Sequence, residues 1–433
     1  MNATGAPKHV GRALLAAAST AFPFAVGIIK NGLLEVLLLA PVVWFLMASR
    51  TRDRAERVLL LLVSLCLTLT VCDVALRPVL GSRLHYSPMN QYQRRLSALP
   101  MLGRWDALVD VSRSVYGDLA AMTGVPAFRE PRVVEFRTDS LGFRNDSVQT
   151  PVDIIVLGDS FAAGVGVTQN GTFAQTLAAR YGRSVYNLSY PGGPYDQYVN
   201  FSIEVPKLAI VPGAQLIWTL YTGNDLDDAG GETWEIGALP WRTGFSAMLV
   251  EYRTFRDRSP LRQIQDALWS RWRGISKDVL IRSLPDGRPV LFYGPQEVWG
   301  DRVRAEAERH PNFPKLLKTL RAMKEAVTRN NVRATIMILP TKGEVYRWLL
   351  SPRSPDEGAR PSGFSEAVLD ACQQVTMRCL DSAPFLREEA RRLFAASREL
   401  LWWRDDTHMN EQGHQALASF VVQEILQPAG GGD

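Results

Sequence analysis

The sequence predicts an α/β fold: a doubly wound parallel sheet with an N-terminal transmembrane helical anchor and a large insertion between two strands. Runs of Val, Ile and Leu alternate with amphipathic stretches from about residue 150 onward, which is typical of parallel strands covered on both faces. The first eighty residues contain three long apolar runs. Residues 226–330 interrupt the alternation over a stretch too long for a loop.

The composition agrees with a folded chain of two or three modules. Of 433 residues, 46% are hydrophobic and 21% are charged, which excludes a disordered, collagen-like or disulfide-scaffold protein. The net charge of +5 is spread along the chain without basic blocks. We therefore expect no nucleic-acid partner, and the mild positive excess fits an anionic membrane surface better.

The apolar runs, residues 13–29, 32–49 and 58–76, approach the ~17–25 residues that cross a bilayer. Four arginines lie between the second and third runs, and short arginine-rich loops stay in the cytoplasm. The third span then runs outward, which places the rest of the chain on the periplasmic side of the cytoplasmic membrane. Because the first run also fits a cleavable signal peptide, two or three spans are both open. The competing interpretation is a long buried hairpin in a soluble protein.

Two carboxylates, Glu35 and Asp73, fall within these runs, and ionisable groups inside a membrane are functional candidates by default. Each lies about one helical turn from an interface residue, Asn31 or Arg77. Snorkelling or pairing therefore explains them better than a functional role does.

These patterns divide the chain into an anchor (1–80), a connector (81–150), the α/β domain (151–225 and 331–428) and an insertion (226–330). Within the connector, residues 81–130 are expected to be helical and polar. Strands are expected at 153–157, 184–188, 215–221, 333–339 and 375–380. Helices are expected at 173–181, 197–208, 313–329, 365–374 and 411–426. In such folds, sites form where the strands end.

The insertion is expected to carry its own structure, with helices around 261–275 and a small strand at 289–293. It holds five of the 11 tryptophans: Trp234, Trp241, Trp269, Trp272 and Trp299. Their rings suit stacking on sugars or a lipid interface, and they suit the core of the insertion equally well. Both interpretations are open.

The motif GDSFAAG, residues 158–164, follows the first expected strand. A serine hydroxyl at a strand-to-helix turn projects into the site, while glycines permit tight turning and the following amides point at an incoming oxyanion. Because Ala162 replaces the last glycine, the motif is not the G-x-S-x-G elbow of α/β-hydrolases. Ser160 is the candidate nucleophile.

His408 is the candidate base for Ser160, because it lies on the loop just before the final helix. Asp405, three residues earlier, can orient the imidazole so that its other nitrogen accepts the serine proton. Glu411 stands in the same relation to His414, but inside the helix, and a triad needs an exposed loop position. The remaining histidines lie in the N-terminal tail, at the membrane edge and in a charged helix of the insertion: His9, His85 and His310.

Two further strands end in donors for an oxyanion. The second ends in NLSYPGG, residues 187–193, and the third in YTGND, residues 221–225. Taken alone, each motif is typical of a turn. A glycine amide and the Asn224 amide at the same sheet edge are expected to converge with the Ser160 amide, each contributing ~2.7–4 kcal/mol to the transition state.

From about residue 150 to 426 the chain resembles the SGNH, or GDSL-type, hydrolase family, through GDSF, the Gly192 region, GND and DDTH. The resemblance implies a flavodoxin-like three-layer fold with Ser160 as nucleophile, His408 as base and Asp405 as its orienting acid. It implies Ser160, Gly192 and Asn224 as the oxyanion hole. Gly193 is the alternative to Gly192, because the doubled glycine leaves the register open. Phe161 stands where the family name has Leu.

A narrower likeness concerns ILPTKGEVY, residues 338–346, and the GFRN turn, residues 142–145. Both resemble membrane-anchored family members associated with exported polysaccharides. This implies a carbohydrate or acyl-ester substrate and partner proteins in envelope biosynthesis. The long insertion leaves the substrate open.

The expected chemistry is attack of Ser160 on an acyl ester, acetyl above all, followed by release of the acyl-enzyme. Release to water makes an esterase, and release to a sugar hydroxyl makes an O-acyltransferase. The alternatives are a catalytically inactive carbohydrate-binding or assembly module, and a lipid esterase or thioesterase.

Four cysteines divide between two settings. Cys66 and Cys72 lie in the third apolar run, whereas Cys372 and Cys379 lie on the side expected to be oxidising, where pairing is open. No Cys or His cluster has the spacing of metal ligands. We therefore expect no metal and no organic cofactor.

Overall fold

The computed structural model describes residues 64, 68–69, 71–77, 80, 87–95, 103–148, 151–229, 259–350 and 360–426. The chain divides into two compact units. One comprises Met1–His85 and Phe245–Trp272, and the other comprises Tyr86–Gly244 and Arg273–Asp433.

The smaller unit contains a helical stretch at residues 71–77 and most of α11 (Pro260–Arg273). Asp73 is fully buried, and its Oδ1 accepts hydrogen bonds from Ser259 Oγ at 2.6 Å and Leu261 N at 3.2 Å. Its Oδ2 pairs with Arg77 at 2.6 Å, as the spacing predicted. This carboxylate therefore stabilises the start of α11.

Among the described residues, none of the helices combines the length and the apolar character that crossing a bilayer requires. The apolar runs 13–29 and 32–49, most of the run 58–76, and Glu35 lie outside the described residues.

The larger unit is built on a five-stranded parallel sheet in the order β11-β10-β7-β5-β6. The strands are β5 (Val152–Leu157), β6 (Val185–Asn187), β7 (Ile210–Tyr221), β10 (Arg333–Leu339) and β11 (Arg378–Asp381). The five predicted strands are confirmed, although β7 begins well before residue 215. The chain passes from β5 to β6 on one side and then crosses to β7 on the other side of β5. The sheet is therefore doubly wound, and its strand order reverses beside β5.

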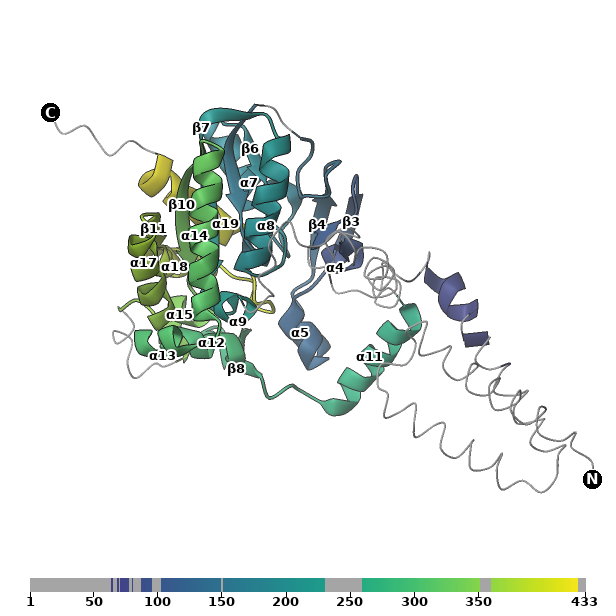
Figure 1. Ribbon diagram of the computed structural model, residues 1–433. Coiled ribbons are helices and arrows are strands. Elements are labelled where there is room, and N and C mark those ends of the chain that lie inside the picture. The colour runs from purple at the N-terminus through teal and green to yellow at the C-terminus, as the bar shows by residue number, and fades with distance from the viewer. Residues whose placement is uncertain are drawn as a thin grey trace, which may run out of the picture. The chain divides into compact units, whose positions relative to one another are not determined.

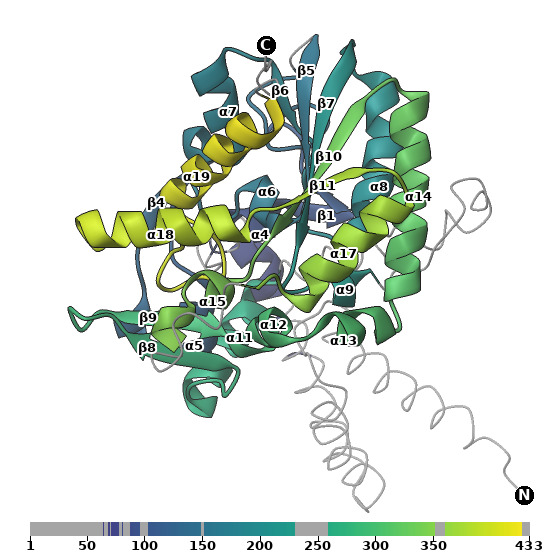
Figure 2. The ribbon, with the colours of Figure 1, turned by 90° about the vertical axis from the view of Figure 1, so that its left-hand side faces the viewer.

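Helices cover both faces of the sheet (Figures 1 and 2). One face packs against α7 (Phe173–Tyr181), α18 (Ala383–Ser397) and α19 (Glu411–Val421). The other packs against α8 (Pro194–Glu204), α14 (Phe313–Arg329) and α17 (Gly363–Gln374). The predicted three-layer α/β architecture is thus confirmed.

Alternation along β5 explains the two cores. Ile154 and Val156 pack toward α7, α18 and α19, whereas Ile155 and Leu157 pack toward α8, α14 and α17. Successive side chains of a strand point to opposite faces, so a strand buried on both sides needs apolar residues throughout. Helix α18 was not predicted, because charged residues fill much of its sequence and only a narrow apolar stripe is buried.

The connector belongs to the same compact unit as the sheet. The prediction that residues 81–130 form a helical connection is wrong, because this stretch contains β3 (Asp110–Val115), which pairs antiparallel with β4 (Arg132–Arg137). Their sequences, DVSRSV and RVVEFR, place valines among charged residues, the pattern of strands exposed on one face. The other elements are α4 (Pro88–Tyr92), β1 (Gln93–Arg95), β2 (Gly103–Trp105), α5 (Asp118–Thr123) and the 3₁₀ turn η1 (Pro126–Phe128).

Between α9 (Asp225–Asp228) and α14, the described part of the insertion forms α11, a hairpin and two helices. The hairpin pairs β8 (Val279–Ser283) with β9 (Pro289–Tyr293), which confirms the strand predicted at 289–293. Helices α12 (Gly294–Asp301) and α13 (Arg304–Arg309) follow. Trp299 is buried in the core and donates to Asp227 at 2.9 Å, so it packs rather than presenting a surface. Trp234, Trp241 and the side chains of Trp269 and Trp272 lie outside the described part.

Short helices complete the fold: α6 (Ser160–Ala163), α15 (Lys342–Val345) and α16 (Arg347–Leu350), with η2 (Gln169–Gly171), η3 (Val205–Lys207) and η4 (Val422–Leu426). Cys372 on α17 and Cys379 on β11 form a disulfide, with their Cα atoms 6.1 Å apart. Cys72 is a free, exposed cysteine, and Cys66 lies outside the described residues.

Candidate active site

Ser160 lies at the turn from β5 into α6, at the point where the strand order reverses. Asp159 caps α6 by accepting from Phe161 N at 2.9 Å, so the chain turns sharply after the strand. A Cβ at Gly158 would overlap the hydroxyl of Thr219 on the neighbouring strand. The glycine is therefore required by close packing between β5 and β7.

His408 and Ser160 meet: His408 Nε2 lies 2.9 Å from Ser160 Oγ. The imidazole is carried by a loop between α18 and α19, closed at its base by a bridge between Trp402 and Met409. Asn410 N also donates to Leu401 O at 3.0 Å. The structure thus joins the two side chains that the sequence selected as nucleophile and base.

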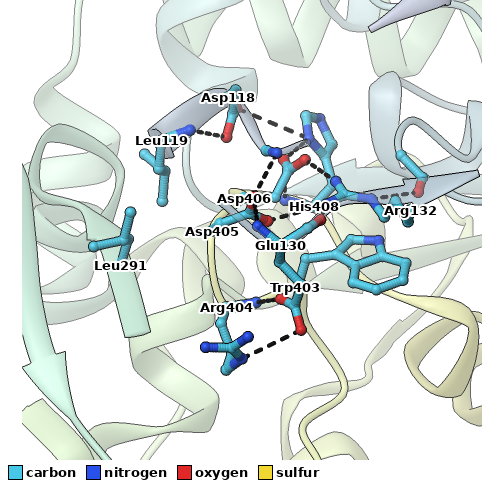
Figure 3. Close-up of polar contacts among 12 residues, drawn as sticks. Asp118, Leu119, Glu130, Arg132, Leu291, Trp403, Arg404, Asp405, Asp406 and His408 are labelled. Atoms are coloured by element: carbon cyan, nitrogen blue, oxygen red, sulfur yellow. Dashed lines mark hydrogen bonds and ion pairs between the residues drawn. The ribbon is translucent and has the colours of Figure 1, made fainter. Parts of the chain in front are cut away.

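The acid that orients His408 is Asp406, and the prediction of Asp405 is wrong. Asp406 Oδ1 lies 2.7 Å from His408 Nδ1 and also accepts from His408 N at 3.1 Å. Asp405 instead accepts from Gly117 N at 2.7 Å and from Arg132 at 3.0 Å (Figure 3). In an irregular turn, sequence spacing does not determine which of two adjacent carboxylates faces the ring.

The electrostatics of the pair favour an imidazolium beside a carboxylate. Burial alone would raise the pKa of Asp406, but the neighbouring His408 and Arg132 outweigh it and hold that pKa below its ordinary range. Burial alone would lower the pKa of His408, but Asp406 outweighs it and raises that pKa. Transient charge on His408 is therefore stabilised where a general base needs it.

Arg132, from the connector, holds both acids of the loop. Its guanidinium lies 3.0 Å from Asp405 and 2.5 Å from Asp406, and it stacks over the Trp403 ring at 4.2 Å (Figure 3). Glu130 supports the same loop by accepting from Arg404 N at 2.8 Å. The sequence analysis missed these residues, because no motif marked the connector.

Lys342 supports the loop from the opposite side. It opens α15 within the ILPTKGEVY segment and is almost wholly buried. Its ammonium donates to the carbonyls of Leu291, Trp403 and Asp406 at 2.7–3.1 Å. Burial lowers the pKa of Lys342 to about 8, and the nearby carboxylates partly offset that effect. The lysine ties the ILPTKGEVY segment to the backbone of residues 403–408, the base loop, which carries His408.

Phe161, the departure from the family name, packs beside the base. Its ring centroid lies 5.1 Å from that of His408 and 4.2 Å from that of Tyr221. Because Phe161 is 2% exposed, it supplies a rigid apolar wall to the imidazole.

The predicted oxyanion donors lie on neighbouring strand ends. Ser160 is the first residue of α6, whose N–H has no partner within the helix. Gly192 follows β6, and Gly193 caps α8, where a Cβ would overlap the carbonyl of Asp228. Asn224 caps α9, and its Nδ2 donates to Asp228 Oδ2 at 2.6 Å, which leaves the second N–H for another acceptor. Their convergence on one oxyanion remains a prediction.

His414 is buried in α19, and its Nδ1 accepts from Phe173 N at 3.0 Å. This bond ties α19 to α7 and requires a neutral imidazole. Burial, together with the charges of Arg144 and His408, lowers the pKa of His414 to about 3. The residue therefore has a packing role in this structure.

One group among the described residues has ligand atoms close enough for a metal: Asp118, Asp406 and His408, all within 4.8 Å of one another. Asp406 and His408 are already bonded to each other, and the cation of Arg132 contacts Asp406. The positive charge and the internal bond both disfavour a metal ion here.

In the described part of the chain, a serine and a histidine meet at the carboxyl edge of a parallel sheet. No protein-family model and no curated protein matches the chain. Several solved structures are similar to the chain in fold.

The chain is similar to the psychrotrophic esterase EstA from Pseudoalteromonas, at 13% identity and a TM-score of 0.31, over 63% of this chain and 96% of that one. It is similar to a protein of the lipolytic G-D-S-L family from Desulfitobacterium hafniense, at 13% identity and a TM-score of 0.31, over 62% and 97%. It is also similar to a Bacillus subtilis protein, at 12% identity and a TM-score of 0.33, over 69% and 68%. These similarities concern the fold alone.

Substitutions of the two aspartates in the loop should have different effects. Asp406→Asn should lower kcat by ~10²–10⁴, because the imidazole loses its anionic partner and its fixed tautomer. Asp405→Asn should act mainly on stability, costing about 1–3 kcal/mol, because it weakens one of the two carboxylate contacts of Arg132 and leaves the contact with Asp406 in place. Ester hydrolysis assays and urea unfolding of both variants measure this. Equal losses of kcat in the two folded variants would contradict it.

Because the pKa of His414 is lowered in the folded chain, we expect the protein to lose stability in acid. Its pKa is about 3 in the folded chain against 6.5 when unfolded, so between these values only the unfolded state binds the proton. The free energy of unfolding should therefore fall as pH drops through this window, by up to about 1.4 kcal/mol per pH unit. Urea unfolding from pH 4 to 7 should show a shallower slope for His414→Gln than for the wild type. Parallel slopes would refute the assignment.

Proposed function

We propose that the protein is a serine ester hydrolase or O-acyltransferase of the SGNH type. The observation that carries the proposal is the continuous chain of contacts from Ser160 Oγ through His408 to Asp406, at 2.9 Å and 2.7 Å. A serine hydroxyl becomes a nucleophile when a neighbouring base takes its proton and a third group orients that base. Both conditions are met at Ser160, beside the end of β5.

In the first half of the reaction, Ser160 Oγ attacks the acyl carbon of an ester while His408 Nε2 takes the hydroxyl proton. Asp406 holds the Nδ1–H and stabilises the imidazolium. The amides of Ser160, Gly192 and Asn224 are the proposed donors to the oxyanion. Collapse of the tetrahedral intermediate breaks the bond to the leaving alcohol, which takes its proton from His408.

In the second half, water or a sugar hydroxyl gives its proton to His408 and attacks the acyl-enzyme. Ser160 then leaves with the proton from His408, which restores the free enzyme. Water yields a carboxylic acid, and a sugar hydroxyl yields a new ester. Ser160, His408 and Asp406 perform the same steps with either acceptor. Whether the acyl group is hydrolysed or transferred therefore depends on whether water or a sugar hydroxyl reaches the acyl-enzyme.

The proposed substrate is an acyl ester, principally acetyl, of an envelope or exported carbohydrate. The support is the resemblance of the ILPTKGEVY and GFRN segments to membrane-anchored members of that kind. Both segments belong to the site's surroundings: Lys342 contacts the base loop, and Arg144 donates to carbonyls of the loop after α6, including Val167 O at 2.6 Å.

The proposed location is the cytoplasmic membrane, with the catalytic unit on the periplasmic side. The arginine-rich stretch at residues 50–57 supports this orientation. The Cys372–Cys379 disulfide supports it independently, because such bonds persist in oxidising compartments. Envelope biosynthesis proteins are the partners that this location suggests.

The catalytic proposal predicts that Ser160→Ala abolishes turnover of p-nitrophenyl acetate and labelling by a fluorophosphonate probe, because both need the hydroxyl. Ser397→Ala, at an exposed position on α18, is the matched control and should retain both. Turnover and labelling by folded Ser160→Ala at the wild-type level would refute the mechanism. A wild-type chain that resists the probe would support a non-catalytic module instead.

The topology predicts that alkaline phosphatase fused after residue 426 is active, because the enzyme requires an oxidising compartment to form its disulfides. A β-galactosidase fusion at the same point should be inactive. The reverse pattern would place the catalytic unit in the cytoplasm.

A further inference from the structure

A second carboxylate, from the connector, reaches the base loop. Asp118 is the first residue of α5, and its Oδ1 accepts from Thr407 N at 2.9 Å and Leu119 N at 2.7 Å. Its Oδ2 accepts from Thr407 Oγ1 at 2.6 Å. Two bonds thus attach Thr407, the residue immediately before His408, to a segment far away in the sequence.

The same carboxylate lies close to the imidazole. Asp118 Oδ2 is 3.9 Å from His408 Nδ1, on the side of the ring that Asp406 contacts. This separation is too long for a hydrogen bond and short enough for strong attraction to a charged ring. The Asp118 side chain is 21% exposed, against 3% for Asp406. Asp118 is therefore the more solvent-exposed of the two carboxylates near His408.

We propose that Asp118 is a positioning residue for the general base: it fixes Thr407, and with it His408, and it adds a second negative charge that stabilises the imidazolium formed during catalysis. The inference rests on the proposed function and extends it to a residue outside the triad. Asp118 contacts the base loop and not the nucleophile, so it acts through His408.

The groups around His408 are compatible with a stabilising charge on Asp118. Asp406 and Asp118 face Nδ1, Thr407 Oγ1 lies 3.2 Å from it, and Ser160 faces Nε2. Phe161 covers a side of the ring, and Asp159 adds a more distant negative charge. Arg132 is the cation in contact with the pair, through the other oxygen of Asp406, and Lys342 binds the Asp406 carbonyl.

The charge of Asp118 depends on its neighbours. Burial, reinforced by the charge of Asp406, raises the pKa of Asp118 to about 7, whereas the positive charge of His408 and the bond from Thr407 act in the opposite direction. A protonated ring therefore favours an ionised Asp118, and the two groups titrate together. This coupling is the property that a purely structural aspartate would lack.

The test compares Asp118→Asn with Asp118→Glu and with Glu325→Gln, a control that neutralises an exposed carboxylate on α14. Rates with p-nitrophenyl acetate are measured from pH 4 to 9. In Asp118→Asn, kcat should fall about tenfold. The acid-limb midpoint of kcat/KM should move about one unit to lower pH, because loss of a negative neighbour lowers the pKa of the base.

Asp118→Glu should retain the wild-type midpoint, because it keeps the charge, although its kcat should fall through imperfect placement of Thr407. Glu325→Gln should match the wild type in both quantities. The proposal is overturned if Asp118→Asn keeps the wild-type midpoint, or if the Asn and Glu variants lose rate equally with unmoved midpoints. Failure of the proposed function is a separate result, since it would appear as wild-type activity in Ser160→Ala.

Discussion

A single projecting turn, residues 403–408, carries the imidazole across the end of the sheet, and the site depends on that turn keeping its shape. The turn is closed at its base by the bridge between Trp402 and Met409. Beyond that bridge, the backbone bond that crosses the turn runs from Trp403 N to His408 O, at 3.3 Å. Its conformation therefore rests on side chains and backbone groups from other segments, which makes the contact between His408 and Ser160 a tertiary property.

Contacts between buried charged groups and their partners hold the turn in place. Asp405 and Asp406 share the guanidinium of Arg132, and Lys342 satisfies carbonyls on the other side. Each of these groups would be costly to bury alone, but together every charged head has hydrogen-bonded partners. Removing Arg132 would leave Asp405 and Asp406 buried without the cation that they share. The network therefore selects one conformation of the turn, even where its net contribution to the free energy of unfolding is small.

The connector is consequently part of the candidate site. Gly117, Asp118, Glu130 and Arg132 all contact the base loop, although the sequence analysis found no catalytic pattern there. A backbone N–H, a helix-terminal aspartate and an arginine at the start of a strand are too common to signal a site by themselves. They become informative only when the fold brings them beside the base.

The sequence by itself determined the five strands, the strand-end position of Ser160 and the choice of His408, because strand periodicity is local and the carboxyl ends of parallel strands share one edge. Tertiary structure alone decided that Asp406, rather than Asp405, faces the imidazole. It also decided that Arg132 and Lys342 hold the loop. The physical reason is that side chains in an irregular turn follow no period. Their directions are set by partners between 61 and 289 residues away, and spacing along the chain carries no record of those partners.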